Sequence, residues 1–252
     1  MLKKILNLFL SFILGIKLVK LLSHKNKIVV LENLSKGFFV KISFSKNADN
    51  LLLNESEGFK WYSKVSSENF EIKLKNKLLK ILQVESFDGY SVDYHKNVLE
   101  NKTEIYKVID YYKKKWPKLK KVPAHGDFTL ANFIFNSDIT NIYIIDWENF
   151  KKSGEVWGYD LVYFYLSVAL LPNLNRNSFS KKEKKELLKM WKYIKKSIKD
   201  NDLKKDPLNY FKNIFDKSKH WSNLSKNSPN KFFLNKSNIN ILKDLDNILK
   251  KN

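Results

Sequence analysis

The sequence contains no cysteine, little glycine and almost no arginine. With no thiol among its 252 residues, disulfides and thiolate metal sites are excluded, and a reducing compartment is permitted. Its seven glycines form no Gly-rich phosphate loop, and Gly37 is the only glycine in the first predicted hairpin. The four histidines are scattered along the chain, so the sequence contains no imidazole metal cluster.

The positive charge of the chain comes almost entirely from lysine. The formal net charge is +21, yet Arg176 is the only arginine, while asparagine and isoleucine are abundant. Surfaces that recognise phosphates usually use arginine for its bidentate fork, so we expect no specific nucleic-acid binding. Two interpretations stay open: a solvated lysine surface, or a surface attracted to an anionic membrane or acidic glycan.

Residues 1–26 predict a basic, apolar N-terminal helix. Lys3 and Lys4 precede an apolar run over Ile5–Leu14, and Lys17 and Lys20 interrupt the apolar residues after it. The run is short for a membrane span, and it is not succeeded by a small-residue cleavage site. Three roles remain open: packing on the domain, lying in a membrane interface, or spanning the bilayer. We expect a cytoplasmic protein, with peripheral association with the inner face of an anionic membrane as one option.

Hydrophobic periodicity predicts an α+β protein with two lobes. β-branched and aromatic runs around Asn33–Gly37 predict a hairpin over Lys27–Phe44, and helical spacing comes next over Asn47–Val65. Lys77–Tyr90 is predicted as a strand and a turn, and Thr103–Trp116 as a helix. The later stretches with helical spacing are Ser180–Asn201, Pro207–Ser218 and Ser237–Lys250.

An acidic block, "VPAHGDFTLANFIFNSDITNIYIIDWENF", lies in otherwise apolar sequence. Two strand-like runs separated by "NSDITN" predict a hairpin that brings Asn132 near Asp146, with Asp127 close by. Asp and Asn oxygens suit Mg²⁺, which bridges phosphates, and a separate Asp can accept a proton from a hydroxyl. The alternative is a hairpin with acidic turn ends and a satisfied His125.

The block resembles the aminoglycoside phosphotransferase and choline kinase superfamily, small-molecule kinases with the protein-kinase-like fold. "HGDFTLANFIF" resembles its catalytic loop, "IIDWENF" its metal-binding segment and "GYDLVYF" its subsequent Gly-x-Asp-Leu segment. Protein kinases usually have Arg in place of Gly126 and Phe-Gly in place of Trp147-Glu148. The resemblance implies a small β-rich N-lobe over residues 27–88 that binds nucleotide, and a larger, mostly helical C-lobe over residues 89–252 that binds the acceptor.

In the N-lobe, the resemblance assigns the nucleotide contacts. Lys41, on the strand "FFVKISF", would neutralise the α- and β-phosphates of ATP, and Glu55 would orient it, with Glu57 as a rival. Glu85 and Phe87, in "LLKILQVESFDG", would lie at the hinge that holds adenine.

In the acidic block, the resemblance assigns the chemistry. Asp127 would orient and deprotonate the acceptor hydroxyl, and His125 would brace the loop. Asn132 and Asp146 would hold Mg²⁺. Two further acids give structural support: Asp160 would fix the loop by hydrogen bonds, and Glu148 would contact the metal through water or act as a cap.

The predicted activity is therefore ATP- and Mg²⁺-dependent phosphoryl transfer to a hydroxyl of a small molecule. The candidate acceptors are a sugar of a surface glycan or lipopolysaccharide core, choline or ethanolamine, and an aminoglycoside. The lysine-rich stretch "KKEKKELLKMWKYIKKSIKD" argues against a polycationic acceptor. The rivals are a non-catalytic, membrane-docked scaffold with a kinase-like fold, and a protein kinase, which the short segment between Asp146 and Asp160 disfavours.

Overall fold

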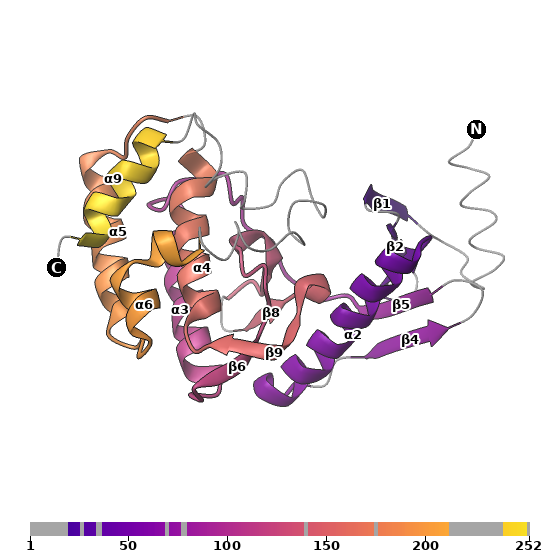
Figure 1. Ribbon diagram of the computed structural model, residues 1–252. Coiled ribbons are helices and arrows are strands. Elements are labelled where there is room, and N and C mark those ends of the chain that lie inside the picture. Colours follow the sequence, from indigo (N-terminus) through magenta and orange to yellow (C-terminus); the bar gives the residue numbers. More distant parts are fainter. Residues whose placement is uncertain are drawn as a thin grey trace. The chain divides into compact units, whose positions relative to one another are not determined.

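The computed structural model describes residues 20–25, 28–33, 37–68, 71–76, 80–138, 141–173, 176–211 and 239–250. The chain forms two compact units (Figure 1). The first contains Met1–Phe87 together with Asp146–Phe150, and the second contains Asp88–Ile145 and Lys151–Asn252. In the described parts, no helix is long and apolar enough to cross a membrane.

An antiparallel five-stranded sheet, in the order β1-β2-β3-β5-β4, forms the first unit with one long helix. The predicted hairpin is confirmed, since β2 pairs antiparallel with β3 from Ile28 opposite Ser43 to Asn33 opposite Phe38. Lys41 lies between Val40 and Ile42, which are fully buried. The strands are β1 (Lys20–Lys25), β2 (Ile28–Asn33), β3 (Phe38–Ser43), β4 (Ile72–Asn76) and β5 (Lys80–Glu85).

Strand β1 corrects the prediction of a helix over residues 1–26. Residues 1–19 of that stretch lie outside the described residues, but Lys20–Lys25 is a strand that pairs antiparallel with β2. The sequence of β2, "IVVLEN", is rich in β-branched residues, and its free edge offers backbone hydrogen bonds to a neighbouring segment. That tertiary pairing outweighs the helical preference of the short lysine- and leucine-rich stretch.

The long helix of the first unit is α2 (Lys46–Ser66), which confirms the predicted helix over Asn47–Val65. Its N-cap, Ser45, accepts a hydrogen bond from the backbone N–H of Ala48, so one orphan donor of the first turn is satisfied. Gly58 faces Trp147 so closely that a Cβ built there would lie 2.6 Å from the Trp147 Cβ. A glycine at this position therefore allows Asp146–Phe150 to pack on the helix.

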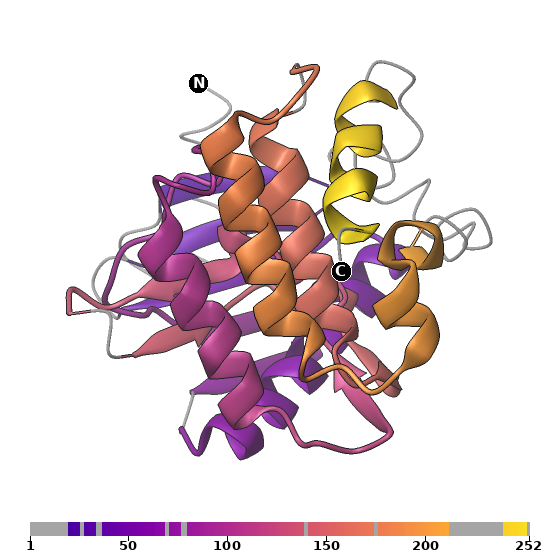
Figure 2. The same ribbon diagram turned by 90° about the vertical axis from the view of Figure 1, so that its left-hand side faces the viewer.

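The second unit is mostly helical, as expected (Figure 2). Two short antiparallel ladders, β6 with β9 and β7 with β8, accompany its helices. The β7–β8 pairing confirms the hairpin predicted within the acidic block. The helices are α3 (Lys102–Lys115), α4 (Tyr159–Leu170), α5 (Lys181–Lys195), α6 (Asn201–Lys205) and α9 (Ile239–Lys250). The short strands are β6 (Lys121–Ala124), β7 (Phe133–Phe135), β8 (Ile142–Ile144) and β9 (Lys151–Val156).

The predicted helices of this unit are confirmed where the structure describes them, except that the helix predicted over Ser180–Asn201 ends at Lys195. For the stretch predicted over Pro207–Ser218, residues 207–211 are helical and residues 212–218 lie outside the described residues. Helix α4 is buried along its whole length and forms the centre of the unit.

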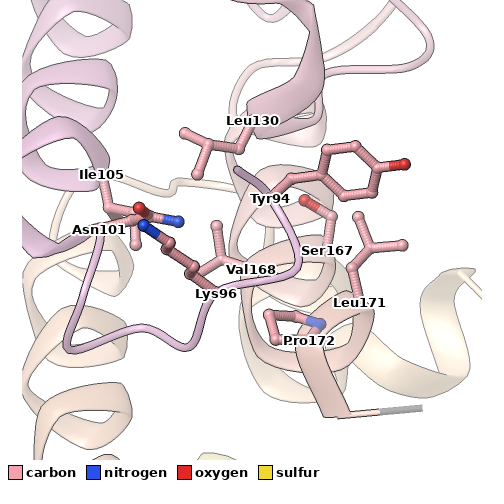
Figure 3. A pocket seen from close by; sticks show the side chains of 9 residues that line it. All are labelled: Tyr94, Lys96, Asn101, Ile105, Leu130, Ser167, Val168, Leu171 and Pro172. Atoms are coloured by element: carbon pink, nitrogen blue, oxygen red, sulfur yellow. The ribbon is translucent and has the colours of Figure 1, made fainter. Parts of the chain in front are cut away.

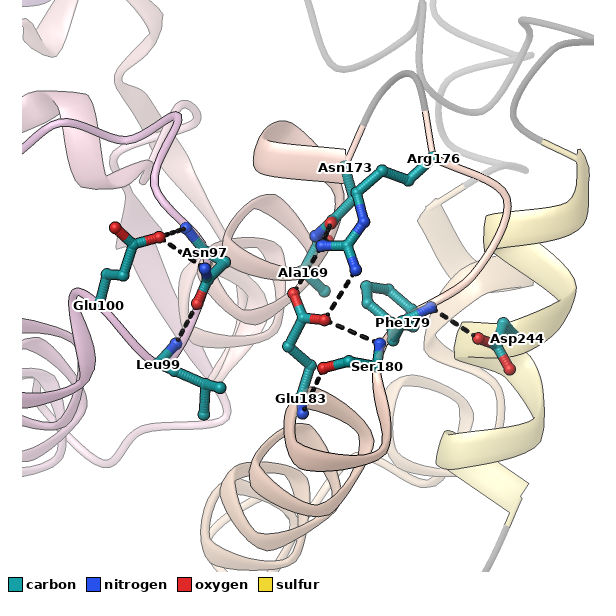
Figure 4. Close-up of polar contacts among 10 residues, drawn as sticks. All are labelled: Asn97, Leu99, Glu100, Ala169, Asn173, Arg176, Phe179, Ser180, Glu183 and Asp244. Atoms are coloured by element: carbon teal, nitrogen blue, oxygen red, sulfur yellow. Dashed lines mark hydrogen bonds and ion pairs between the residues drawn. The ribbon is translucent and has the colours of Figure 1, made fainter.

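The only arginine of the chain connects α4, α5 and the segment between them (Figure 4). Arg176 donates to both carboxylate oxygens of Glu183, at 2.7 and 2.9 Å, and to the side-chain oxygen of Asn173. Glu183 also forms a capping box with Ser180 at the start of α5. The N–H of Phe179 donates to Asp244 of α9, so one polar network fixes three helices.

Candidate active site

In the first unit, Lys41 lies between two carboxylates. Its Nζ is 2.8 Å from Oε1 of Glu55 on α2 and 2.8 Å from Oδ1 of Asp146. The β3 strand positions the lysine, and the buried face of α2 positions Glu55, which is 1% exposed. Glu57 lies on the exposed face of α2, so Glu55 and not its rival pairs with the lysine.

The electrostatics of this cluster are dominated by burial and by an excess of acid. Burial lowers the pKa of Lys41, but Asp146, Glu55 and Glu148 together raise it well above its ordinary value. Burial raises the pKa of Glu55 to about 7, which Lys41 opposes and Asp146 reinforces. The buried Oε2 of Glu55 has no hydrogen-bond partner among the described residues. One lysine thus faces three carboxyl groups, which leaves negative charge in excess.

An aromatic cluster holds Asp146 and Glu148 on the first unit. Trp147 is fully buried and stacks on Tyr62 of α2 at 5.2 Å between ring centroids, with Trp61 edge-on at 5.9 Å. Residues Trp147–Asn149 form the 3₁₀ turn η2, and the side chain of Asn54 donates to the carbonyl of Glu148. Asp146 has a left-handed backbone conformation with φ 63°, which is uncommon outside glycine and common at functional sites.

In the second unit, the catalytic-loop sequence is held by a buried carboxylate. Asp160, in the first turn of α4, accepts hydrogen bonds from the backbone N–H of His125 at 2.8 Å and of Gly126 at 3.2 Å. The His125 ring lies between the N–H of Asp127 and the carbonyl of Ile145, so the neutral tautomer satisfies both of its nitrogens. Burial raises the pKa of Asp160 to about 7, against the two N–H donors, which lower it.

Asp127 receives a hydrogen bond on each carboxylate oxygen. The hydroxyl of Tyr163 donates to Oδ1 at 3.2 Å, and Nδ2 of Asn132 donates to Oδ2 at 3.3 Å and to the Asp127 carbonyl at 2.7 Å. Because Nδ2 of Asn132 makes these two hydrogen bonds, it is the side-chain oxygen of Asn132 that is oriented to serve as a potential metal ligand. Sequence reasoning missed Tyr163. It lies within the quoted "GYDLVYF", three residues after Asp160 and therefore on the same side of α4.

The expected adenine hinge lies at the end of β5. The backbone N–H of Ser86 donates to the carbonyl of Gly37, which has φ 60° and directly precedes β3. The carboxylate of Glu85 accepts a hydrogen bond from the N–H of Glu71. Phe87 is the last residue of the first unit before Asp88 begins the second. The structure contains no nucleotide, and the adenine contacts of Glu85 and Phe87 stay predictions.

A pocket in the second unit reaches the catalytic loop (Figure 3). Leu130, which lies between Asp127 and Asn132 in sequence, forms part of its wall. The other lining residues come from the segment before α3, from α3 itself and from the end of α4: Tyr94, Lys96, Asn101, Ile105, Ser167, Val168, Leu171 and Pro172.

Comparison with known proteins agrees with this geometry. Residues 74–172, which include the catalytic loop, Asp146 and Asp160, match the "Phosphotransferase enzyme family". No curated protein sequence matches the chain.

Solved structures extend the likeness beyond the matched segment. Aminoglycoside phosphotransferase APH(3'')-Id from Streptomyces rimosus is 12% identical, with a TM-score of 0.58 over 79% of this chain and 94% of that one. WaaP, solved with acyl carrier protein, is 13% identical, with a TM-score of 0.50 over 81% and 90% of the two chains. The protein-kinase-like fold expected from the sequence is confirmed. Residues 74–172 match the kind of family that the sequence resembles.

The predicted site residues fall into two groups. Lys41, Glu55, Asp146 and Glu148 belong to the first unit, and the loop residues with Asp160 belong to the second. The predicted metal ligands are therefore divided, with Asp146 in one unit and Asn132 in the other. Within the described residues, no group of three or more Asp, Glu or His side chains forms a metal site by itself.

Proposed function

We propose that the protein is an ATP- and Mg²⁺-dependent phosphotransferase that acts on a hydroxyl group of a small molecule. The observation that carries the proposal is the lysine held at 2.8 Å from both Glu55 and Asp146. A buried ion pair is costly as a stabilising device, because desolvation offsets much of its Coulomb energy. A lysine shared between two acids is better explained as a charge oriented toward an anionic ligand.

The donor set suits a divalent cation bound with a nucleotide. Three carboxyl groups around one lysine leave net negative charge, and carboxylate and amide oxygens are the ligands that Mg²⁺ accepts. Asp146 and Asn132 would hold the metal, and Glu85 and Phe87 would contact the adenine. When bound, ATP would supply the phosphoryl group and Mg²⁺ would neutralise part of the charge of its phosphates. Lys41 would orient the α- and β-phosphates, with Glu55 fixing the lysine.

Asp127 acts on the acceptor. Its carboxylate is oriented by Tyr163 and Asn132, and each oxygen has a further lone pair with which to accept the proton of a hydroxyl. The loop that carries Asp127 is fixed by Asp160 through backbone N–H groups. Phosphoryl transfer needs positioning more than covalent help, so a rigid loop of this kind suits the reaction.

We propose an uncharged or anionic acceptor, such as a sugar of a surface glycan or lipopolysaccharide core. Choline or ethanolamine and an aminoglycoside are the alternatives, and a non-catalytic scaffold is the rival of another class. The observation that bears on this choice is α5, whose exposed face carries Lys181, Lys182, Lys185, Lys189 and Lys192. Lysines on the acceptor-binding lobe repel a polyamine and attract phosphorylated or acidic saccharides.

The test separates chemistry from nucleotide binding. Asp127→Asn is nearly isosteric and removes the proton acceptor, so turnover should fall about 10³-fold while MgATP affinity changes little. Asp146→Asn should weaken the Mg²⁺-dependent part of ATP binding as well. The matched control is Asp202→Asn, at an exposed position of α6, which should change neither quantity. Calorimetric titration of MgATP and a turnover assay over a panel of the named acceptors measure both.

Two outcomes would overturn the proposal. If Asp127→Asn and Asp146→Asn turn over like the parent, the acidic block is only a structural hairpin. If the parent binds no MgATP and phosphorylates no acceptor of the panel, the scaffold takes its place.

A further inference from the structure

Helices α3 and α5 lie side by side and run in the same direction (Figure 2). Near their N-terminal ends, Lys102 of α3 pairs with Glu186 of α5 at 2.9 Å. Near their C-terminal ends, Lys113 of α3 lies over the ring of Tyr193 of α5 at 3.6 Å from its centroid. Because both contacts come in the same order along the two helices, both C-termini emerge at one end of the second unit.

This end of the unit concentrates lysine from three segments. We define the lysine end as the last turn of α3, the segment 116–121 that comes after it, and the C-terminal end of α5 with the residues just after it. Its basic residues are Lys113, Lys114, Lys115, Lys118, Lys120, Lys121, Lys192, Lys195, Lys196 and Lys199. The nearby acids on these segments are Asp110, which accepts a hydrogen bond from Tyr193, and Asp200, which caps α6.

The lysines of the three segments are close enough to affect one another. The pKa of Lys113 is lowered by burial and, in addition, by Lys118 and Lys196, while Asp110 opposes the shift. Lys118 lies beyond α3 and Lys196 lies at the end of α5, so the repulsion connects all three segments. Repulsion of this kind destabilises the free protein and is relieved when a negatively charged surface covers the lysines.

Leu119 stands out within the lysine end. It is 62% exposed, the most exposed large apolar side chain among the described residues, and its neighbours in sequence are Lys118, Lys120 and Lys121. Lysines in a last helical turn complement the helix dipole, which accounts for Lys113–Lys115. The dipole does not account for three further lysines past the helix end, nor for an exposed leucine among them.

We propose that the lysine end docks on an anionic lipid surface. The lysine ammonium groups bind lipid phosphates, and Leu119 inserts among the acyl chains at the level of the head groups. Lysine supplies point charges without a bidentate fork, which suits a fluid layer of phosphates better than a specific phosphate or nucleic-acid site. This surface lies in the second unit and contains none of residues 1–26.

Vesicle binding of the full chain tests the proposal. The probe is a series of phosphatidylcholine vesicles with and without phosphatidylglycerol, and the measured quantity is the partition constant from co-sedimentation. The triple variant Lys118→Gln, Lys120→Gln, Lys121→Gln should bind anionic vesicles roughly 100-fold more weakly, at about fivefold per lysine. Leu119→Gln, which changes no charge, should weaken binding about tenfold.

The matched control is the triple variant Lys181→Gln, Lys182→Gln, Lys185→Gln, at the opposite end of α5 and equally exposed. It removes the same charge and should weaken binding less than fivefold. Every variant keeps residues 1–26, so any affinity of that stretch for vesicles contributes equally to all of the variants. If both triple variants lose vesicle affinity equally, binding depends only on the net charge of the protein and the proposal is wrong. If Leu119→Gln binds like the parent, or the first triple variant does, the lipid assignment is wrong.

Discussion

Each unit buries one carboxyl group of its candidate site, and the two carboxyls are stabilised in different ways. Glu55 and Asp160 are both 1% exposed, and burial raises the pKa of each to about 7. Glu55 is paired with the side chain of Lys41, and its second oxygen has no hydrogen-bond partner among the described residues. Asp160 uses both oxygens to accept backbone N–H groups.

The difference separates an adjustable site from a rigid one. Lys41 has two carboxylate partners at equal distance, so its ammonium group can exchange one of them for a phosphate without leaving the other unpaired. Asp160 binds only backbone, which cannot change partner without unfolding the loop. We infer that the first unit responds electrostatically to ligand, whereas the second keeps Asp127 fixed.

The largest expected effect on stability comes from removing the shared lysine. Lys41→Met leaves Glu55 and Asp146 unpaired, and the free energy of unfolding at pH 8 should fall by about 3 kcal/mol. The loss should shrink at pH 5, because Glu55 then takes up a proton. Urea unfolding at the two pH values measures it, with Lys60→Met on the exposed face of α2 as the control. An equal loss at both pH values would contradict the electrostatic account.

Removing the rigid acid should cost nearly as much, with the opposite dependence on pH. Asp160→Ala leaves two buried N–H groups without an acceptor, a loss of about 2–3 kcal/mol. The loss should be larger at pH 5 than at pH 8, because the pKa of Asp160, raised from 3.8 to about 7 by burial, makes the intact protein lose stability as the pH rises through 7. Asp160→Asn keeps one carbonyl oxygen and should lose about half as much. A loss that vanishes at pH 5 would remove the distinction between the two acids.

The third effect is a pH dependence carried by Glu55. Its pKa in the folded chain, about 7, is above the ordinary 4.5, so the folded state binds the proton more tightly. The stabilisation is therefore complete below about pH 4.5 and is lost as the pH rises through 7, a decline on the order of 3 kcal/mol. Glu55→Gln should flatten this part of the stability profile. Glu57→Gln, further along α2 and exposed, should leave it unchanged.

The smallest expected effect concerns the packing that brings Asp146 to Lys41. Gly58→Ala gains helix propensity, but the new Cβ would lie 2.6 Å from Cβ and 2.9 Å from Cε3 of Trp147. The net result should be a loss of about 1 kcal/mol in stability, with a weaker Mg²⁺-dependent part of ATP binding. Lys60→Ala, on the exposed face of the same helix, should be neutral or stabilising. A stabilised Gly58→Ala would mean that Trp147 shifts freely.

The sequence was sufficient wherever a pattern is local. Apolar periodicity predicted α2 and the β2–β3 hairpin, and the spacing of Asp127 and Asn132 placed both on one short loop. It left Glu55 and Glu57 as alternatives, because a two-residue difference turns a side chain to the other side of a helix and only the buried core decides which side faces inward.

Contacts between distant segments were beyond the reach of local pattern. The hydrogen bond from Lys41 to Asp146 spans 105 residues, and that from Tyr163 to Asp127 spans 36. Strand β1 was predicted as helix because its pairing partner, not its own composition, determines its conformation. Each of these features depends on a neighbour that the chain reaches only after folding.

The five residues Asp146–Phe150 have a consequence for the order in which the protein can be made. They complete the core of the first unit. The ribosome adds them, however, only after residues 88–145, which belong to the second unit. Until these five residues have been synthesised, the face of α2 that carries Gly58, Trp61 and Tyr62 lacks the ring contacts that Trp147 makes with Trp61 and Tyr62. A fragment that stops at Phe87 would therefore expose an apolar surface. The first unit matures late during synthesis, and chaperones that bind exposed apolar segments have a defined interval in which to act on it.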